Sequence, residues 1–257
     1  TCEAFDTQAN NYSMSFDGID DVMAIPSTFL NNLNEFTIQT DFYANNQNNY
    51  YASIFKHFQE NSNGRYLCVR YWGDYFEFIV QTSNGTATID NGPNGNNFSN
   101  PNEGAWHSIS LTYDGTNLKA YINGTLVGTE LLSGSLSSSD LEPIYFGGYP
   151  DDIENPDTFN GFIDNIQFWN YAMNDEEIEQ YTNCIPTGNE TGLIGCWNFE
   201  AGDDGDLIIA DISSNSNSGT ITESVFSNET PEQNCPADAI TMYGGDNCEL
   251  TLTLENL

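Results

Sequence analysis

The stretch of residues 159–181 changes its hydrophobic period once, and this change constrains the fold more than any other feature. Its first half is rich in β-branched and aromatic residues, as in a strand. Beyond it, Ile178 and Tyr181 have the spacing of one helical face. Asn174 and Glu177 have the spacing of a capping box at the start of that helix. The stretch therefore predicts a strand that runs into a short helix.

One acidic residue, Asp164, interrupts the apolar part of this stretch. A carboxylate in an apolar strand must either be exposed or be satisfied by a partner such as a metal ion. Asp164 is therefore a candidate functional residue.

Three stretches of the chain follow one another in a recognisable order. Residues 11–26 contain the run FDGIDD, residues 104–128 contain WH, YDG and YING, and residues 159–181 contain GFID. In this order they resemble the laminin-G-like domains of the concanavalin A-like lectin and glucanase superfamily, of the type found in bacterial surface proteins. The resemblance covers about residues 10–183. It implies an all-β jelly-roll sandwich of two antiparallel sheets with a short C-terminal helix. It implies no single function, because the superfamily includes carbohydrate binders, adhesion modules and enzyme-attached domains.

The charge of the chain excludes several kinds of partner. There are 38 Asp and Glu against 4 Lys and Arg, a formal net charge of −34. Such a chain repels nucleic-acid backbones and anionic membrane surfaces. The sequence also lacks a run of about eighteen apolar residues, so no direct membrane insertion is expected. The acids form a solvated surface, or some of them gather into sites for divalent cations, and both descriptions can hold together.

A calcium ion is the cofactor that the resemblance implies. Related sandwiches hold it by a carbonyl of the turn after the first strand and by the acid of the GFID stretch. In this sequence these are Gly18 and Asp164, with Asp20 as an additional ligand. The alternative is that the acids of the turn only make turn hydrogen bonds. A second calcium site is a candidate in the densest acidic segment, formed by Asp203, Asp204, Asp206 and Asp211.

The clearest hairpin, residues 66–81, supplies a candidate ligand face. A two-residue turn pairs Arg70 with Glu77 and Trp72 with Tyr75. One face of this hairpin is apolar, and the other mixes aromatic, charged and amide groups. On the concave sheet of a lectin-like sandwich, the mixed face can stack and hydrogen-bond a sugar. The alternative is an ordinary outer face with an Arg–Glu pair. An acidic loop at the rim adds further candidates: Tyr149, Asp151 and Asp152.

The six cysteines indicate an oxidising, secreted or cell-surface setting, because their number is even and the chain is an acidic, Asn-rich β protein. No CxxC pair occurs and only two histidines are present, so a structural zinc site is not expected. The pairs that are close in sequence are the expected disulfides, Cys184 with Cys196 and Cys235 with Cys248. The pairing of the remaining cysteines stays open.

The order of the segments suggests three parts. Residues 1–190 are expected to form the sandwich. Residues 191–230 resemble the leader strand and turn that normally precede the first strand of such domains, yet here they follow it. So short a segment cannot bury its own core, so it is expected to pack on the sandwich as a permuted edge strand or an appendage. A truncated second module is the alternative. Residues 231–257 are expected to form a small β tail or the start of a following module of a longer chain.

No motif predicts catalysis. The sequence lacks the paired-carboxylate strand of retaining glucanases, a G-x-S-x-G motif, a P-loop and a cysteine beside a histidine. The chain is therefore not expected to be an enzyme. Two classes of function remain. The first is an extracellular, calcium-binding, lectin-like module that binds a glycan. The second is a structural or adhesive block that contacts a surface protein in an assembly.

Overall fold

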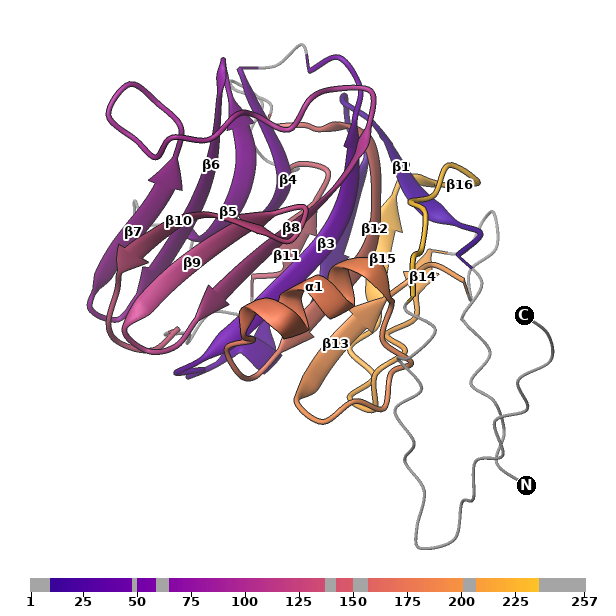
Figure 1. Ribbon diagram of the computed structural model, residues 1–257. Helices are drawn as coiled ribbons and strands as arrows, with labels where there is room; N and C mark the ends of the chain where they lie inside the picture. The colour runs from indigo at the N-terminus through magenta and orange to yellow at the C-terminus, as the bar shows by residue number, and fades with distance from the viewer. Residues whose placement is uncertain are drawn as a thin grey trace, which may run out of the picture.

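Two antiparallel β-sheets lie face to face, and one α-helix covers the outside of one of them (Figure 1). The computed structural model describes residues 10–47, 50–58, 65–136, 142–149, 157–200 and 207–235. These residues form the antiparallel sandwich that the sequence predicts, with a single short α-helix among them.

Sheet A has eight strands, in the order β10-β9-β8-β3-β12-β1-β16, with β13 also paired to β12. In chain order they are β1 (Ser13–Asp17), β3 (Phe36–Ala44), β8 (Trp106–Tyr113), β9 (Asn117–Ile122), β10 (Thr125–Leu131), β12 (Asn160–Trp169), β13 (Leu193–Trp197) and β16 (Val225–Ser227). Strand β12 is central. It pairs with β3 on one side, while β1 and β13 share its other side.

Sheet B also has eight strands, in the order β14-β15-β2-β11-β4-β5-β6-β7. They are β2 (Val22–Ile25), β4 (Tyr51–Phe58), β5 (Arg65–Trp72), β6 (Tyr75–Thr82), β7 (Gly85–Asp90), β11 (Ile144–Phe146), β14 (Ile208–Ile209) and β15 (Gly219–Thr222). A short 3-10 helix, Thr28–Leu30, follows β2. The β5–β6 hairpin confirms the predicted register, since Arg70 lies opposite Glu77 and Trp72 opposite Tyr75.

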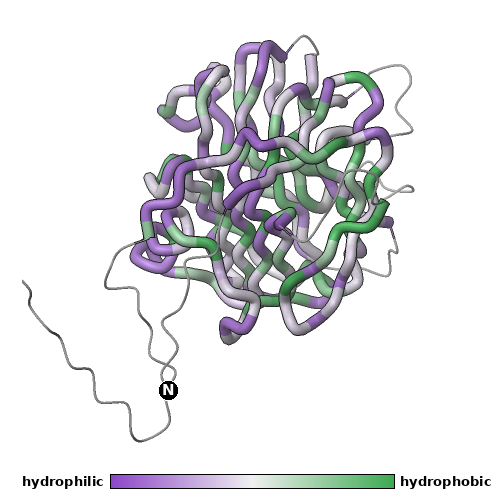
Figure 2. Tube along the Cα trace, turned by 90° about the vertical axis from the view of Figure 1, so that its right-hand side faces the viewer, coloured by the Kyte–Doolittle hydropathy of each residue, from purple (hydrophilic) through white to green (hydrophobic). Residues whose placement is uncertain are grey.

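The core lies between the sheets because side chains alternate across each strand. Figure 2 shows this alternation of polar and apolar residues along the chain. Aromatic rings fill much of the interior: Phe42 of β3 stacks on Phe76 of β6 with ring centroids 6.0 Å apart. The predicted apolar face of the β5–β6 hairpin is buried in this core. The opposite face of the hairpin therefore points away from the sandwich.

Helix α1 (Asp175–Asn183) begins with the predicted capping box. Asn174 Oδ1 accepts hydrogen bonds from the Glu176 and Glu177 backbone N–H groups, and Glu177 Oε2 accepts from the Asn174 N–H. Ile178 anchors the helix in a second apolar cluster with Trp169 and Met173. The helix therefore packs on the outer face of sheet A (Figure 1). Within the described ranges, no helix is long and apolar enough to cross a bilayer.

The segment after the helix contributes strands to both sheets. Strand β13 pairs with β12, and β16 pairs with β1, in sheet A. Strand β15 pairs with β2 in sheet B, and β14 continues that edge. The described part of the leader-like segment is therefore built into the sandwich by backbone hydrogen bonds.

The disulfides expected from sequence proximity are wrong for Cys184 and Cys235, which are bonded to each other with Cα atoms 4.7 Å apart. Cys196 is a buried thiol in β13, where it packs among the apolar side chains under the helix. Its pairing with Gln167 of β12 fixes it inside sheet A. The C-terminal segment instead returns to the end of the helix, where the Asn234 N–H donates to the Asn183 carbonyl. Cys248 lies outside the described residues.

Candidate functional site

A row of aromatic side chains crosses the outer face of sheet B. Tyr51, Trp72 and Tyr75 lie directly opposite one another on β4, β5 and β6. Directly opposed residues point to the same face, and neighbouring strands lie about 4.8 Å apart, so the row spans roughly 10 Å. The Trp72 Nε1–H donates to the Tyr50 hydroxyl at 2.9 Å, and Tyr50 is 62% exposed. We call these four residues the aromatic row.

A row of polar side chains lies beside the aromatic row. Its members pair across β4, β5, β6 and β7 and are Ser53, Arg70, Glu77 and Asp90. Arg70 Nε donates to Glu77 Oε1, and both side chains are buried. The Arg70 guanidinium also lies over the Tyr51 ring, 4.0 Å from its centroid. The Arg70–Glu77 ion pair therefore helps to fix the Tyr51 ring of the aromatic row.

A second ion pair extends this polar row. Asp157 accepts hydrogen bonds from Ser53 Oγ and from Lys56 Nζ, each at 2.7 Å. Arg70 Nη1 lies 3.8 Å from the same Asp157 carboxylate. Two of the four Lys and Arg residues of the chain are thus buried here with two acids. A buried charge must be paired, and this network neutralises each member and fixes its rotamer.

The sequence predicted part of this site. Arg70, Trp72, Tyr75 and Glu77 all lie on the predicted face. Tyr149 joins them through Lys56, whose Nζ lies 5.0 Å from the centroid of its ring. Asp151 and Asp152 lie outside the described residues.

Sequence reasoning missed Lys56 because of a β-bulge. The register of β4 against β5 shifts between Ser53 and Phe55. The extra residue places Lys56 on the same face as Ser53, whereas strict alternation places it on the other face. A lysine inside a strand of a chain with four basic residues was the available signal. No local signal pointed to Asp157, because its partners Ser53 and Lys56 lie 104 and 101 positions earlier in the chain.

The calcium ligands expected from the resemblance are not brought together. Asp17 pairs with Asn160 at the end of β1, and the Gly18 carbonyl accepts a hydrogen bond from Thr158 Oγ1. Asp164 lies four residues further along β12 than Asn160. At about 3.3 Å per residue this is roughly 13 Å. One ion binds oxygens at about 2.3–2.6 Å, so Gly18 and Asp164 do not fit a shared site.

Three carboxylates gather instead in the turn after β1. Oxygens of Asp17, Asp20 and Asp21 lie within 4.8 Å of one another. Asp21 is buried and accepts a hydrogen bond from the Asp17 N–H. Burial raises the pKa of Asp21 to about 6, and the charges of Asp17 and Asp20 add to the rise. Of the carboxylates predicted to bind calcium at this turn, the cluster includes Asp20 but not Asp164.

Residues 17–179 match the sequence model of the concanavalin A-like lectin/glucanases superfamily. The chain belongs to this superfamily. A comparison with curated proteins gave no match.

Solved structures share the fold of this lectin/glucanase-type domain at low identity. A candidate carbohydrate-binding protein from Bacteroides ovatus aligns with a TM-score of 0.63 and 15% identity, over 88% of this chain and 61% of that one. The heptameric SAP-like pentraxin of Limulus polyphemus aligns with a TM-score of 0.54 and 14% identity, over 85% and 96%. The CBM40 of a Ruminococcus gnavus sialidase, bound to α2,3-sialyllactose, aligns with a TM-score of 0.50 and 14% identity, over 66% of this chain and 97% of that one. The chain thus spans about 61% of the length of the Bacteroides structure.

Asp164 of this lectin/glucanase-type domain has a buried neighbour that the sequence did not indicate. It lies opposite Asp41 of β3 in sheet A. Burial raises the pKa of Asp164 well above its usual range, and the charge of Asp41 adds to the rise. Burial also raises the pKa of Asp41 to about 7, although hydrogen bonds from Asn165 and Ser108 oppose the rise. These two carboxyl groups therefore favour protonation rather than a pair of charges.

Asp211, a candidate for the second calcium site, accepts several hydrogen bonds from its own segment and from β13. Its Oδ1 accepts the Cys196 and Ser213 backbone N–H groups, and its Oδ2 accepts Ser213 Oγ and the Asn217 N–H. Four hydrogen bonds make this carboxylate the centre of a turn beside β13. Asp203, Asp204 and Asp206 lie outside the described residues.

Proposed function

We propose that this domain is a non-catalytic extracellular module that binds a glycan on the outer face of sheet B. The observation that carries the proposal is the aromatic row beside the polar row. Flat aromatic faces stack on the apolar face of a sugar ring, and tyrosine hydroxyls at the edges of such rings can hydrogen-bond its hydroxyls. The buried polar row keeps the aromatic side chains in place. The row is about 10 Å long by strand spacing, which suits one or two sugar rings.

The fixed geometry of the site favours binding over catalysis. Glu77 is paired with Arg70, and Asp157 with Lys56. Neither carboxylate is thereby placed to exchange a proton with a ligand. Residues already held in one geometry lose less conformational freedom when a ligand binds, which favours affinity. A sugar-binding role also agrees with the Bacteroides ovatus structure, a candidate carbohydrate-binding protein, and with the Ruminococcus gnavus domain, which is bound to α2,3-sialyllactose. The Cys184–Cys235 disulfide supports an oxidising, extracellular location.

Replacing Trp72 by alanine tests the proposed site. We expect Trp72→Ala to weaken binding to the best ligand of a glycan array at least about tenfold, because the central ring of the row is lost. Titration calorimetry with that glycan measures the change. Tyr12→Ala is the control, since Tyr12 is an exposed aromatic residue beside β1 of sheet A and lies in neither proposed site. Equal affinity of wild type and Trp72→Ala would place the glycan elsewhere.

A structural or adhesive role is the second candidate. It is favoured by the apolar side chains exposed along the edge strands β14 and β16, namely Leu207, Ile208 and Val225. Open sheet edges with exposed apolar residues are surfaces on which other chains can pair. If the wild-type domain binds no glycan of the array, this candidate replaces the first.

We further propose that a calcium ion binds at the turn after β1. The spacing of the oxygens of Asp17, Asp20 and Asp21 allows one hard cation to contact all three. An ion bound only to the folded state stabilises it by about 2.7 kcal/mol at a hundred times its Kd. For a domain of this size, that corresponds to a rise in Tm of roughly 5 to 10 °C.

Chelation distinguishes the turn from Asp164. We expect EDTA to lower the Tm of wild type and of Asp164→Asn, but to leave that of Asp20→Asn nearly unchanged. Asp74→Asn, which changes an exposed acid in the β5–β6 turn, is the control for the loss of one charge. If Asp164→Asn loses the response to EDTA and Asp20→Asn keeps it, the ion lies at Asp164 instead.

A further inference from the structure

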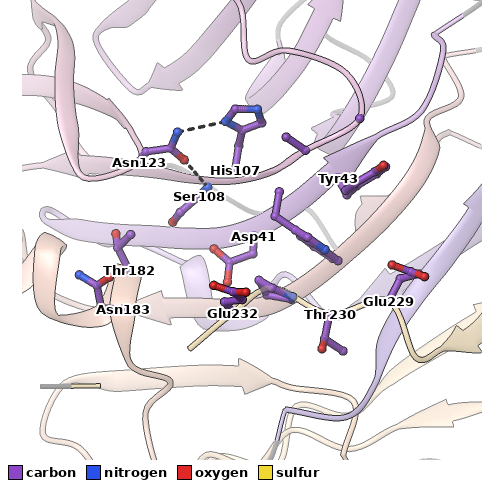
Figure 3. A pocket seen from close by; sticks show the side chains of 14 residues that line it. Asp41, Tyr43, His107, Ser108, Asn123, Thr182, Asn183, Glu229, Thr230 and Glu232 are labelled. Atoms are coloured by element: carbon purple, nitrogen blue, oxygen red, sulfur yellow. Dashed lines mark hydrogen bonds between the residues drawn. The ribbon is translucent and has the colours of Figure 1, made fainter. Parts of the chain in front are cut away.

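A cavity of about 580 Å³ opens on the outer face of sheet A, on the opposite side of the sandwich from the aromatic row. Figure 3 shows its side chains converging from separate segments of the chain. Asp41 and Tyr43 come from β3 and Trp106 from β8, while Thr182 comes from the end of helix α1. Residues 229–232, which return along the sheet, form the remaining wall. The volume falls in the range of small-molecule sites, roughly 300–1,000 Å³.

The charge of the cavity lining determines which ligand charge it favours. Its ionisable acids are Asp41, Glu229 and Glu232, and the lining contains neither lysine nor arginine. Asp41 is only 8% exposed, so its carboxylate is poorly hydrated where it faces the cavity. Burial favours the protonated form of Asp41 when no counter-charge is near, and a cation placed against it would stabilise the carboxylate instead. A phosphate or carboxylate ligand is therefore disfavoured, and a cation is favoured.

The size and chemistry of the walls favour an organic cation over a metal ion. Trp106 and Tyr43 form a T-shaped pair with centroids 5.9 Å apart, and both rings line the cavity. Aromatic faces attract ammonium groups and stack on sugar rings. Metal ions such as calcium take oxygen ligands in a compact shell, which this wide, partly aromatic cavity does not provide.

Fixed polar groups complete the walls. The Asn123 side chain accepts from the Ser108 N–H through Oδ1, and its Nδ2 lies 3.0 Å from His107 Nδ1 (Figure 3). The other ring nitrogen of His107 lies 3.1 Å from the Asn102 carbonyl. Thr182 and Asn183 add a hydroxyl and an amide at the helix end. Such groups suit a ligand with several hydroxyls.

We propose that this cavity is a second binding site, for an aminated monosaccharide. Its ammonium lies against Asp41, its ring lies on Trp106, and its hydroxyls contact the amides and hydroxyls of the rim. This site is separate from the aromatic row on sheet B.

The Cys184–Cys235 disulfide holds the wall of this site in place. It fastens the returning segment just after residues 229–232 to the end of helix α1. Before the disulfide, Asn10 Nδ2 donates to the Pro231 carbonyl, and Thr230 Oγ1 donates to the Asn10 carbonyl. The segment is thus held at residues 230 and 231, within the wall, and again at Cys235, just after it.

A matched pair of sugars tests the site. D-glucosamine and D-glucose differ in one ammonium group in place of a hydroxyl. We expect wild type at pH 7 to bind glucosamine at least tenfold more tightly than glucose, measured by ligand-observed NMR titration. Asp41→Asn should reduce glucosamine binding to the glucose level, and Trp106→Ala should weaken it. Trp72→Ala should leave glucosamine binding unchanged, since Trp72 lies on the other sheet.

Each failure has a separate meaning. Equal binding of the two sugars by wild type, or unchanged glucosamine binding by Asp41→Asn, would overturn the proposal. Loss of glucosamine binding in Trp72→Ala, with Asp41→Asn unaffected, would assign the amine to the glycan face instead. Thermal unfolding of each variant verifies that it is folded. Loss of array binding alone would contradict the proposed function of sheet B and leave this site standing.

Discussion

Breaking the Cys184–Cys235 disulfide will lower the free energy of unfolding by about 4 kcal/mol. The bonded residues are 51 positions apart, and cross-linking a loop of that length removes chain entropy from the unfolded state by about this amount. The double variant Cys184→Ser/Cys235→Ser removes the bond without leaving a thiol at either position. Urea unfolding of the two proteins measures the difference.

The reduced wild type provides the control for this prediction. Under a strong reductant, wild type and the double variant should unfold at the same urea concentration, because neither then contains the bond. Hydrogen exchange should show the largest loss of protection at residues 229–235, whose backbone is tied to the helix end. Identical stability of the oxidised wild type and the double variant would contradict the prediction.

Stability will fall as the pH rises from about 4 to about 7, and Asp41 will account for much of the fall. Burial raises the pKa of Asp41 from 3.8 to about 7. The folded state therefore binds a proton that the unfolded state has already lost over this interval. A raised carboxyl pKa stabilises the fold fully at low pH, and that stabilisation is lost as the pH approaches the folded value. A shift of about three units corresponds to roughly 4 kcal/mol.

Asp41→Asn isolates this effect from the repulsion among the other acids. An amide keeps the size of the side chain and does not ionise, so the variant should gain stability over wild type at pH 8 and match it near pH 4. The nearby titratable and charged groups are Asp164 on β12, His107 on β8, and Glu229 and Glu232 of the returning segment. Asp74→Asn, at an exposed turn, should keep the wild-type pH slope. Parallel stability curves for wild type and Asp41→Asn would refute the assignment.

The sandwich was predictable because its signals are local. The turn at Gly73 and Asp74 sets the register of β5 and β6, and residue opposition follows from that turn alone. The capping pattern of Asn174 and Glu177 likewise acts within one helical turn. Such features depend on few residues, so the sequence contains all that is needed to infer them.

The failed expectations all concern partners that are distant in the chain. Asp164 was correctly singled out as an acid in an apolar strand, yet its neighbour Asp41 is 123 positions away and is brought there by the pairing of β3 with β12. The proximity of Cys184 and Cys196 in sequence was misleading, because sheet pairing holds Cys196 in β13. Lys56 was missed through a single bulge. Long-range pairing and bulges are set by the packing of the whole sandwich, which no local pattern reports.

The place where the returning segment is fastened also decides how the domain would respond to mechanical tension. A pulling force that enters at Cys235 passes through the disulfide to Cys184 at the end of helix α1. The strands between these cysteines, β13 to β16, then lie outside the path of the force and are not stretched. A force at Asn10 acts on β1, which is held by β12 on one side and by the shielded strand β16 on the other. Because the disulfide carries the force past strands β13 to β16, these strands stay folded and β16 continues to support β1.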